Sequence, residues 1–339
     1  MKKILKRVLI ISLIIITILA VSSFLYVKIA FKTPDYAEKF ESTIIVDIHN
    51  HDASHYYKSL FVWNQYNIDK IVLFGNISEP SAMETDKQAW IAYNRYPDRF
   101  YPFFAAINTY SDECLEYVKN NLELGYYGIG EIMAASQFSP FANKTIWKAE
   151  NPMDGYLPEI YEICAEYKAP LLLHIDPPSQ KNIDALELAL DTYPDTTFIL
   201  AHVNVYNSNE LVDSLLSAHD NLYMDLFVGF VNNPECHQSL DDYAEIIKKY
   251  PDRFMVSSDS AYDITYEDAY KAIYDLFELL DDETVEKIAH LNFEQIIEQQ
   301  PMTQSQIETI QEICNKQGID IVYSAFNKIE ANEFIIAHQ

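Results

Sequence analysis

Glycine is scarce in this sequence, with seven among 339 residues. An open sheet that binds a dinucleotide usually has a glycine-rich turn after its first strand. Here the first apolar run of the acidic part of the chain begins at Ile44 and ends in His49-Asn50-His51. The scarcity of glycine at this turn therefore argues against a dinucleotide-binding sheet.

Cysteine is also scarce, and the four cysteines are widely separated at Cys114, Cys164, Cys236 and Cys314. No pair has the C-x-x-C spacing of a zinc knuckle, and the number is small for a disulfide framework. We therefore expect mostly buried free thiols.

Basic residues are outnumbered about two to one. The chain has 24 Lys and Arg against 51 Asp and Glu, a net charge of −27. Six of those basic residues precede the first acidic residue, Asp35, so the remainder is still more acidic than this figure indicates. A protein needs a basic surface to bind nucleic acid, so this acidic composition argues against nucleic acid as a partner.

The N-terminal segment has the pattern of a membrane anchor. Four basic residues precede the apolar run Val8–Val27, which only four Ser or Thr residues interrupt. About twenty apolar residues span a bilayer, more than the core of a cleaved signal requires. We predict a single-pass anchor within residues 1–34, in the cell membrane, with the rest of the chain outside the cytoplasm. The alternative is a signal cleaved near Ser22 and a secreted protein.

Short apolar runs alternate with helical patterns from about residue 43 onward. The expected strands are Thr43–His49, Lys70–Phe74, Phe100–Ile107, Tyr126–Ile132, Pro170–Ile175, Thr197–Val203, Leu222–Phe227 and Arg253–Asp259. Continuous apolar runs are typical of parallel strands that are buried on both faces. Eight strands that alternate with helices predict an α/β fold, a (β/α)8 TIM-like barrel over residues 35–300. Residues 301–339 are expected to form an extension packed on the barrel.

A short phrase recurs at the junctions between helices and strands. Residues 96–100 and 250–254 both read Tyr-Pro-Asp-Arg-Phe, and residues 193–195 read Tyr-Pro-Asp. Proline stops the preceding helix, and the turn leads into the next strand. We interpret the phrase as structural, with no role in chemistry.

The first expected strand ends in a pair of histidines. His49 and His51 are two residues apart, so on a strand they project from the same face with Cα atoms about 6.6 Å apart. Two imidazoles at this spacing can converge on one cation, since neutral imidazole is a common metal ligand. Taken alone, the pair fits equally well two surface histidines at a strand end.

Four further residues of ligand type end other apolar strands: Glu131, His174, His202 and Asp259. In a barrel enzyme the active site lies at the C-terminal ends of the strands. Buried carboxylates and imidazoles are costly unless they are paired or bind a metal. The recurrence at one end of the barrel therefore favours a metal site.

These residues and their order resemble the amidohydrolase superfamily of metal-dependent hydrolases, over about Ile44 to Ile297. The resemblance implies a distorted TIM barrel in which His49, His51, His174, His202 and Asp259 hold the metal. In members with two metals the fourth strand supplies a bridging ligand, and Glu131 occupies that place. The related decarboxylase-like branch usually lacks a carboxylate there.

The ligand types favour one or two divalent cations, with zinc as the expected metal and Mn²⁺ or Fe²⁺ as alternatives. The resemblance implies a small-molecule substrate and hydrolysis of an amide, ester, lactone or phosphoester by activated water. Asp259 would accept the proton of that water, and His202 would polarise the scissile oxygen if only one metal is bound. Two alternatives stay open: a metal-dependent decarboxylase and a non-catalytic surface binding module.

Four other residues are candidates for substrate contact. His55 follows the histidine pair, and Asp176 and Asn204 follow two of the predicted ligands. Trp147 lies in an insertion, residues 133–151, whose aromatic residues could wall the pocket. The alternatives are a helix-surface position for His55 and an ordinary packed loop for the insertion. The sequence gives no indication of the oligomeric state.

Overall fold

The computed structural model describes residues 12–19, 21–22, 32–140, 142–260 and 264–338. The predicted anchor Val8–Val27 therefore lies partly outside the described residues. Its described part is helical and exposed. Within the described ranges, none of the helices combines the length and the apolar character needed to cross a membrane.

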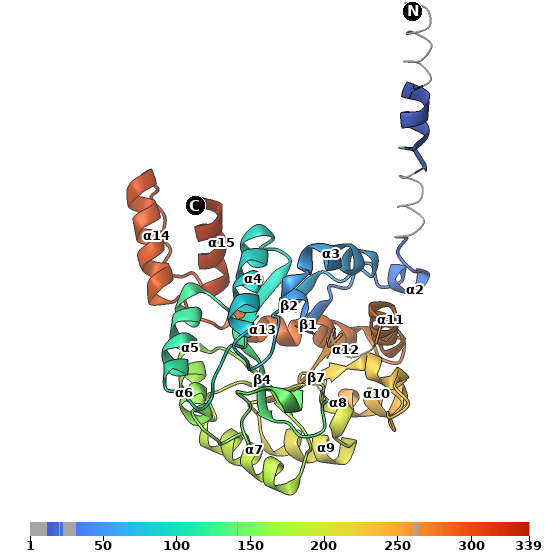
Figure 1. The fold of residues 1–339 in the computed structure, drawn as a ribbon, viewed down its shortest axis with the longest axis vertical. Helices are drawn as coiled ribbons and strands as arrows, with labels where there is room; N and C mark the ends of the chain where they lie inside the picture. Colours follow the sequence, from blue (N-terminus) through green and yellow to red (C-terminus); the bar gives the residue numbers. More distant parts are fainter. Residues whose placement is uncertain (1–11, 20, 23–31, 141, 261–263, 339) are drawn as a thin grey trace, which may run out of the picture.

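Eight parallel strands form the centre of the molecule, in the order of the sequence (Figure 1). They are β1 Val46–Asn50, β2 Lys70–Leu73, β3 Phe100–Phe104, β4 Gly128–Ala135, β5 Leu171–Ile175, β6 Phe198–Leu200, β7 Leu222–Phe227 and β8 Phe254–Ser257. Each pairs with the next, and β1 also lies beside β8. The predicted TIM-like barrel is confirmed.

Helices follow the strands and surround them (Figure 1). The longer ones are α3 Tyr56–Gln65, α4 Ala82–Arg95, α5 Glu113–Leu124, α6 Leu157–Tyr167, α7 Gln180–Thr192, α9 Asn209–Ala218, α10 Leu240–Lys249, α11 Tyr266–Phe277 and α13 Asn292–Glu298. Shorter pieces are α2 Asp35–Glu38, η1 Asp52–Ser54, η2 Ala142–Lys144, α8 Val203–Tyr206, η3 Val228–Asn232, α12 Asp282–Glu286 and η4 Lys287–Leu291.

Burial explains why the strands read as continuous apolar runs. Every residue of β1, β3, β4, β5, β6 and β8 is buried, because helices cover the outer face and side chains fill the interior. Apolar surface on both faces of a strand is thereby removed from water, which is the main favourable contribution to folding.

The repeated Tyr-Pro-Asp-Arg-Phe phrase forms the same junction twice. In both copies the backbone N–H of the arginine donates to the tyrosine carbonyl, at 3.0 Å for Arg99 and 3.1 Å for Arg253. The Arg99 guanidinium donates to the carbonyl of Ile68, and that of Arg253 donates to the carbonyl of Leu222. Each arginine thus ties the start of its strand to the strand beside it.

Hydroxyl side chains cap the starts of two helices. The hydroxyl of Thr265 caps α11 by accepting a hydrogen bond from the backbone N–H of Asp268. The hydroxyl of Ser208 caps α9 in the same way, by accepting a hydrogen bond from the backbone N–H of Leu211. The side-chain amide of Asn207, just before it, donates to the carbonyl of Val203.

The C-terminal segment forms a pair of helices, α14 Gln304–Gln317 and α15 Lys328–His338. Figure 1 shows the pair beside α4 and α5. Thr303 donates to the carbonyl of Glu123, and Asn332 donates to the carbonyl of Gly125. The segment therefore packs where the chain enters β4, at the opposite end of the barrel from the predicted site.

Candidate metal centre

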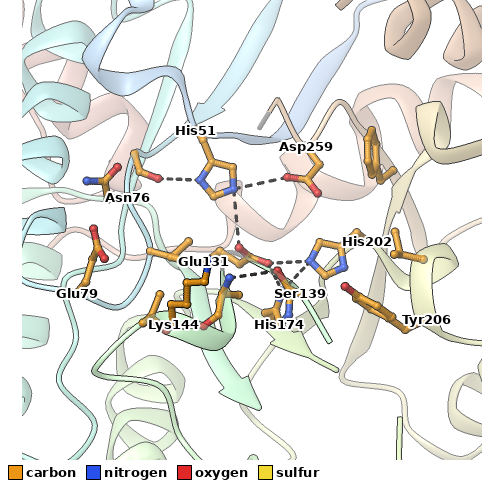
Figure 2. Close-up of a pocket in the computed structure, with 16 residues that line it drawn as sticks. His51, Asn76, Glu79, Glu131, Ser139, Lys144, His174, His202, Tyr206 and Asp259 are labelled. Atoms are coloured by element: carbon orange, nitrogen blue, oxygen red, sulfur yellow. Dashed lines mark hydrogen bonds and ion pairs between the residues drawn. The ribbon is translucent and has the colours of Figure 1, made fainter. Parts of the chain in front are cut away.

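The six predicted ligands meet at the C-terminal ends of the strands. Figure 2 shows five of them around one cavity, with Glu131 in the middle. They are His49 in β1, His51 after it, Glu131 in β4, His174 in β5, His202 after β6 and Asp259 after β8. Their functional roles stay predictions, but the barrel brings all six side chains together.

The first cluster consists of His49, His51 and Asp259. The two Nε2 atoms are 3.1 Å apart. Oδ1 of Asp259 lies 3.6 Å from each of them. Three potential donor atoms thus surround a single point at the mouth of the barrel.

The second cluster consists of Glu131, His174 and His202, all buried. Oε1 of Glu131 lies 2.9 Å from Nδ1 of His174 and 2.8 Å from Nε2 of His202. The two imidazole nitrogens are 2.9 Å apart. This cluster offers one carboxylate oxygen and two nitrogens.

Glu131 connects the clusters because its two oxygens face opposite ways. While Oε1 faces the second cluster, Oε2 lies 3.8 Å from Nε2 of His51 and 3.9 Å from Nε2 of His49. A carboxylate with one oxygen toward each group of donors has the geometry of a bridging ligand.

The first pair of histidines is oriented by groups behind it. Nδ1 of His49 lies 2.7 Å from Oδ2 of Asp225, and Nδ1 of His51 lies 2.7 Å from the carbonyl oxygen of Gly75. A carbonyl only accepts, so Nδ1 of His51 carries the proton and its Nε2 presents a lone pair. Hydrogen bonds of this kind commonly set the tautomer of a ligand histidine.

In the second cluster only one histidine has such a partner. Nε2 of His174 lies 2.8 Å from Oδ2 of Asp176, and Nδ1 is left facing Glu131. Nδ1 of His202 is buried and has no hydrogen-bond partner among the described residues. His202 is held instead through its backbone N–H, which donates to Oδ2 of Asp225 at 2.9 Å.

The buried carboxylates of the two clusters favour positive charge on the groups beside them. Burial opposes protonation of His49, yet Asp259 and Asp225 outweigh it and raise its pKa to about 10. Burial likewise opposes protonation of His174, but Glu131 and Asp176 raise its pKa to about 9. Although burial favours its neutral form, Glu131 has a pKa well below its usual range because of the neighbouring histidines.

Cations fit this donor set. When His174 is neutral and its Nε2 carries the proton, Nδ1 places a lone pair against Oε1 of Glu131. Nε2 of His49 and Nε2 of His51 likewise place lone pairs against each other unless a proton lies between them. A cation at each cluster would resolve both conflicts and supply the charge that the buried carboxylates require. Imidazole and carboxylate together suit zinc and other first-row divalent metals.

A cavity of about 440 Å³ opens over the clusters. Its lining includes Ile77, Glu79, Ser139, Lys144, Thr145, Val205, Tyr206 and Phe227 besides five of the six predicted ligands. The insertion at residues 133–151 contributes to the wall, but through Ser139, Ala142, Lys144 and Thr145. Its aromatic Phe138 is exposed instead, and Phe141 lies outside the described residues.

The four predicted substrate residues do not line the cavity. His55 is exposed, because η1 turns the chain outward after β1. Asp176 is turned toward His174 and the backbone of the insertion, and the Asn204 amide donates to the carbonyl of Phe227. Trp147 is half-buried, and its backbone N–H donates to the carbonyl of Ser78.

Asp225 is an important residue that the sequence reasoning missed. It is fully buried in β7 and touches both His49 and the backbone of His202. A lone aspartate within the apolar strand Leu222–Phe227 is the signal that could have revealed it, since a buried carboxylate needs partners. The carbonyl of Gly75 has no corresponding signal, because every residue has one.

A nearly closed eight-stranded barrel with imidazoles and carboxylates at the C-terminal strand ends is typical of metal-dependent enzymes of the TIM-barrel type. A family model described as amidohydrolase matches residues 62–295. That match covers more than half of the chain, and this protein belongs to the amidohydrolase family. A comparison with curated proteins finds no match.

Solved structures with the same fold are distant in sequence. An uncharacterized TIM-barrel protein from Bordetella bronchiseptica is 16% identical, with a TM-score of 0.56 over 75% of this chain and 98% of that one. A 2,6-dihydroxybenzoate decarboxylase from Rhizobium is 13% identical, with a TM-score of 0.52 over 75% and 98%. A TatD homologue from Escherichia coli K12 is 17% identical, with a TM-score of 0.53 over 74% and 97%. At these identities the likeness concerns the fold alone.

Proposed function

We propose that this protein is a metal-dependent hydrolase that cleaves an amide, ester, lactone or phosphoester bond in a small substrate. The observation that carries the proposal is the position of Glu131, with one oxygen toward each cluster. Such a carboxylate favours two cations. Paired cations about 3.5–4 Å apart are typical of phosphatases, nucleases and aminopeptidases. Zinc is the proposed metal, with Mn²⁺ or Fe²⁺ as alternatives.

Bound zinc would polarise the scissile bond and lower the pKa of a water molecule. We assign to Asp259 the transfer of a proton from water to the leaving group, because its carboxylate lines the cavity beside the first cluster. His49, His51 and His174 are held by Asp225, Gly75 and Asp176, respectively, with their free nitrogens toward the site. His202 is a ligand when two cations bind, and it would contact the scissile oxygen when only one does.

Two measurements test this function. Elemental analysis of protein refilled with zinc should approach two equivalents per chain. A screen of chromogenic esters, anilides and phosphodiesters should show turnover that chelation removes and zinc restores. Turnover confined to the release of CO₂ from 2,6-dihydroxybenzoate would instead support the decarboxylase alternative. A metal-loaded protein that turns over none of these probes would favour the surface binding module.

We further propose that the apolar run Val8–Val27 anchors the protein in the cell membrane, with the barrel outside the cytoplasm. Its length and the basic residues before it support this. The full protein should then stay with membranes through a carbonate wash. Recovery of a free protein that begins near Ser22 would show a cleaved signal and a secreted enzyme.

A further inference from the structure

One lysine lines the cavity. Among the described residues that form the wall, Lys144 is the sole lysine or arginine. It ends η2, within the insertion at residues 133–151, and its side chain is exposed. Figure 2 shows Lys144 and Glu79 on one side of the cavity and Tyr206 on the other. A cation here is unexpected, since the chain carries a net charge of −27.

Lys144 differs from the lysine four residues further on. The ammonium of Lys148 donates to the carbonyls of Ser136 at 2.9 Å and Asn143 at 2.7 Å, and these hydrogen bonds stabilise the insertion. Within the described part of the chain, the ammonium of Lys144 has neither a hydrogen bond nor an ion pair. Its three donors are therefore available to a molecule in the cavity.

The insertion that carries Lys144 is tied to the candidate metal centre. The carboxylate of Asp176 accepts the backbone N–H groups of Phe138 at 2.8 Å and Ser139 at 3.0 Å. Oδ2 of the same carboxylate lies 2.8 Å from Nε2 of His174. The backbone of the insertion that carries Lys144 is thus held by the same carboxylate that contacts a predicted ligand of the second cluster.

The rest of the cavity indicates what a molecule would present to this lysine. Ile77, Val205 and Phe227 provide apolar wall, while the donor clusters form the floor. A volume of about 440 Å³ lies within the range of sites for small molecules. These features fit a small molecule with an apolar body, a reactive group at the clusters and an anionic group at the rim.

We propose that Lys144 binds an anionic oxygen group of the substrate, a carboxylate or phosphate remote from the scissile bond. This deepens the proposed function and rests on it: the substrates would be small organic acids that carry the hydrolysable bond. A charge-assisted hydrogen bond of this kind changes affinity by about tenfold to a hundredfold.

Glu79 provides the competing explanation. It also lines the cavity, and its carboxylate accepts a hydrogen bond from the hydroxyl of Ser81. Lys144 could serve only to offset the negative charge of Glu79. In that case Glu79→Gln would remove the need for the lysine, and the double variant Glu79→Gln/Lys144→Met would bind anions as the parent does.

Calorimetry with zinc-loaded full-length protein tests the proposal through two matched probes, glutarate and pentanoate. Both have five carbons and one carboxylate able to reach the metal, but only glutarate has a second. The parent should bind glutarate about tenfold to a hundredfold more tightly than pentanoate. Lys144→Met should lose this preference, alone and combined with Glu79→Gln, whereas Lys119→Met, which removes an exposed cation from α5, should keep it.

Hydrolysis of mono(4-nitrophenyl) glutarate and 4-nitrophenyl pentanoate separates this inference from the proposed function. In Lys144→Met the KM for the anionic ester should rise by a similar factor, with little change for the neutral ester. Loss of the glutarate preference in Lys144→Met, without turnover of either ester by the parent, would support the lysine site and contradict hydrolysis of esters. Turnover with a glutarate preference that survives in Lys144→Met would overturn the role of Lys144.

Discussion

At the carboxyl end of the strands the barrel buries carboxylates among histidines, whereas at the amino end it buries one lysine against a backbone carbonyl. Glu131, Asp176 and Asp225 are all buried at the first end, each in contact with an imidazole. At the other end Lys328 is fully buried and donates to the carbonyl of Tyr126 at 3.0 Å. Both arrangements carry a desolvation cost.

The two ends differ in what their buried charges can do. The carboxylates lie beside histidine nitrogens that converge beneath an open cavity. A cation from solution can therefore reach these nitrogens and carboxylate oxygens and bind them. Lys328 begins α15, its ammonium donates to the carbonyl of Tyr126 just before β4, and it is not among the cavity-lining residues. The first end is therefore built for a ligand, and the second holds the C-terminal helices in place.

The largest effect is expected from Glu131→Gln, which removes the charge between the two clusters. Zinc content should fall from about two equivalents toward one, because the amide bridges cations poorly. Loss of one cation removes several kcal/mol of transition-state stabilisation, so kcat should fall by on the order of 10³. Elemental analysis and turnover of the ester found in the screen provide the two measurements. One equivalent in the parent would contradict the two-cation arrangement and move attention to His202.

Asp259→Asn tests the proton transfer at the same end of the barrel. The amide keeps the shape and one ligand oxygen but does not accept a proton at neutral pH. Zinc content and fold should persist while kcat falls by about 10²–10⁴, the range for a general acid–base group. If activity falls only in proportion to zinc content, Asp259 is solely a ligand. Full zinc with near-normal turnover would exclude it from proton transfer.

Asp225→Asn tests the support behind the first cluster. The amide can still lie between the His49 ring and the backbone N–H of His202, but it removes the negative charge that favours the proton on Nδ1 of His49. Loss of such a partner typically weakens metal binding by about 10–100-fold. Competition with a chromogenic zinc chelator measures the change. Asp191→Asn, at an exposed carboxylate that lies 3.4 Å from His219, provides the matched control.

The sequence contained enough information for the barrel and its six converging side chains, because both depend on short-range patterns. A buried parallel strand reads as an apolar run, and a ligand at its end occupies a position that the fold brings to one edge. The cavity wall could not be read in this way. Ser139 and Lys144 reach it through hydrogen bonds between Asp176 and the insertion, contacts across about forty residues of sequence. The outward turn at η1 similarly placed His55 away from the site.

The smallest effect concerns the amino end, where the stability of α15 should depend on pH. Burial lowers the pKa of Lys328 to about 7, although Glu123 and Cys164 oppose the change. The unfolded lysine titrates near its ordinary value of 10.5. Between these values the unfolded state binds a proton that the folded state lacks, so raising the pH from 7 to 9 should stabilise the docked helix. The slope for one proton is at most about 1.4 kcal/mol per pH unit.

Hydrogen exchange of the α15 amides at pH 7, 8 and 9 measures this slope, with variants compared at each pH to cancel the intrinsic rate. Lys328→Met should abolish it, because methionine fills the space of the side chain without a titrating group. Lys316→Met, at an exposed position of α14, should retain the slope of the parent. A slope that survives in Lys328→Met would assign the pH dependence to another group. In that case only the buried carboxylates at the C-terminal strand ends, and not Lys328, would distinguish the two ends of the barrel.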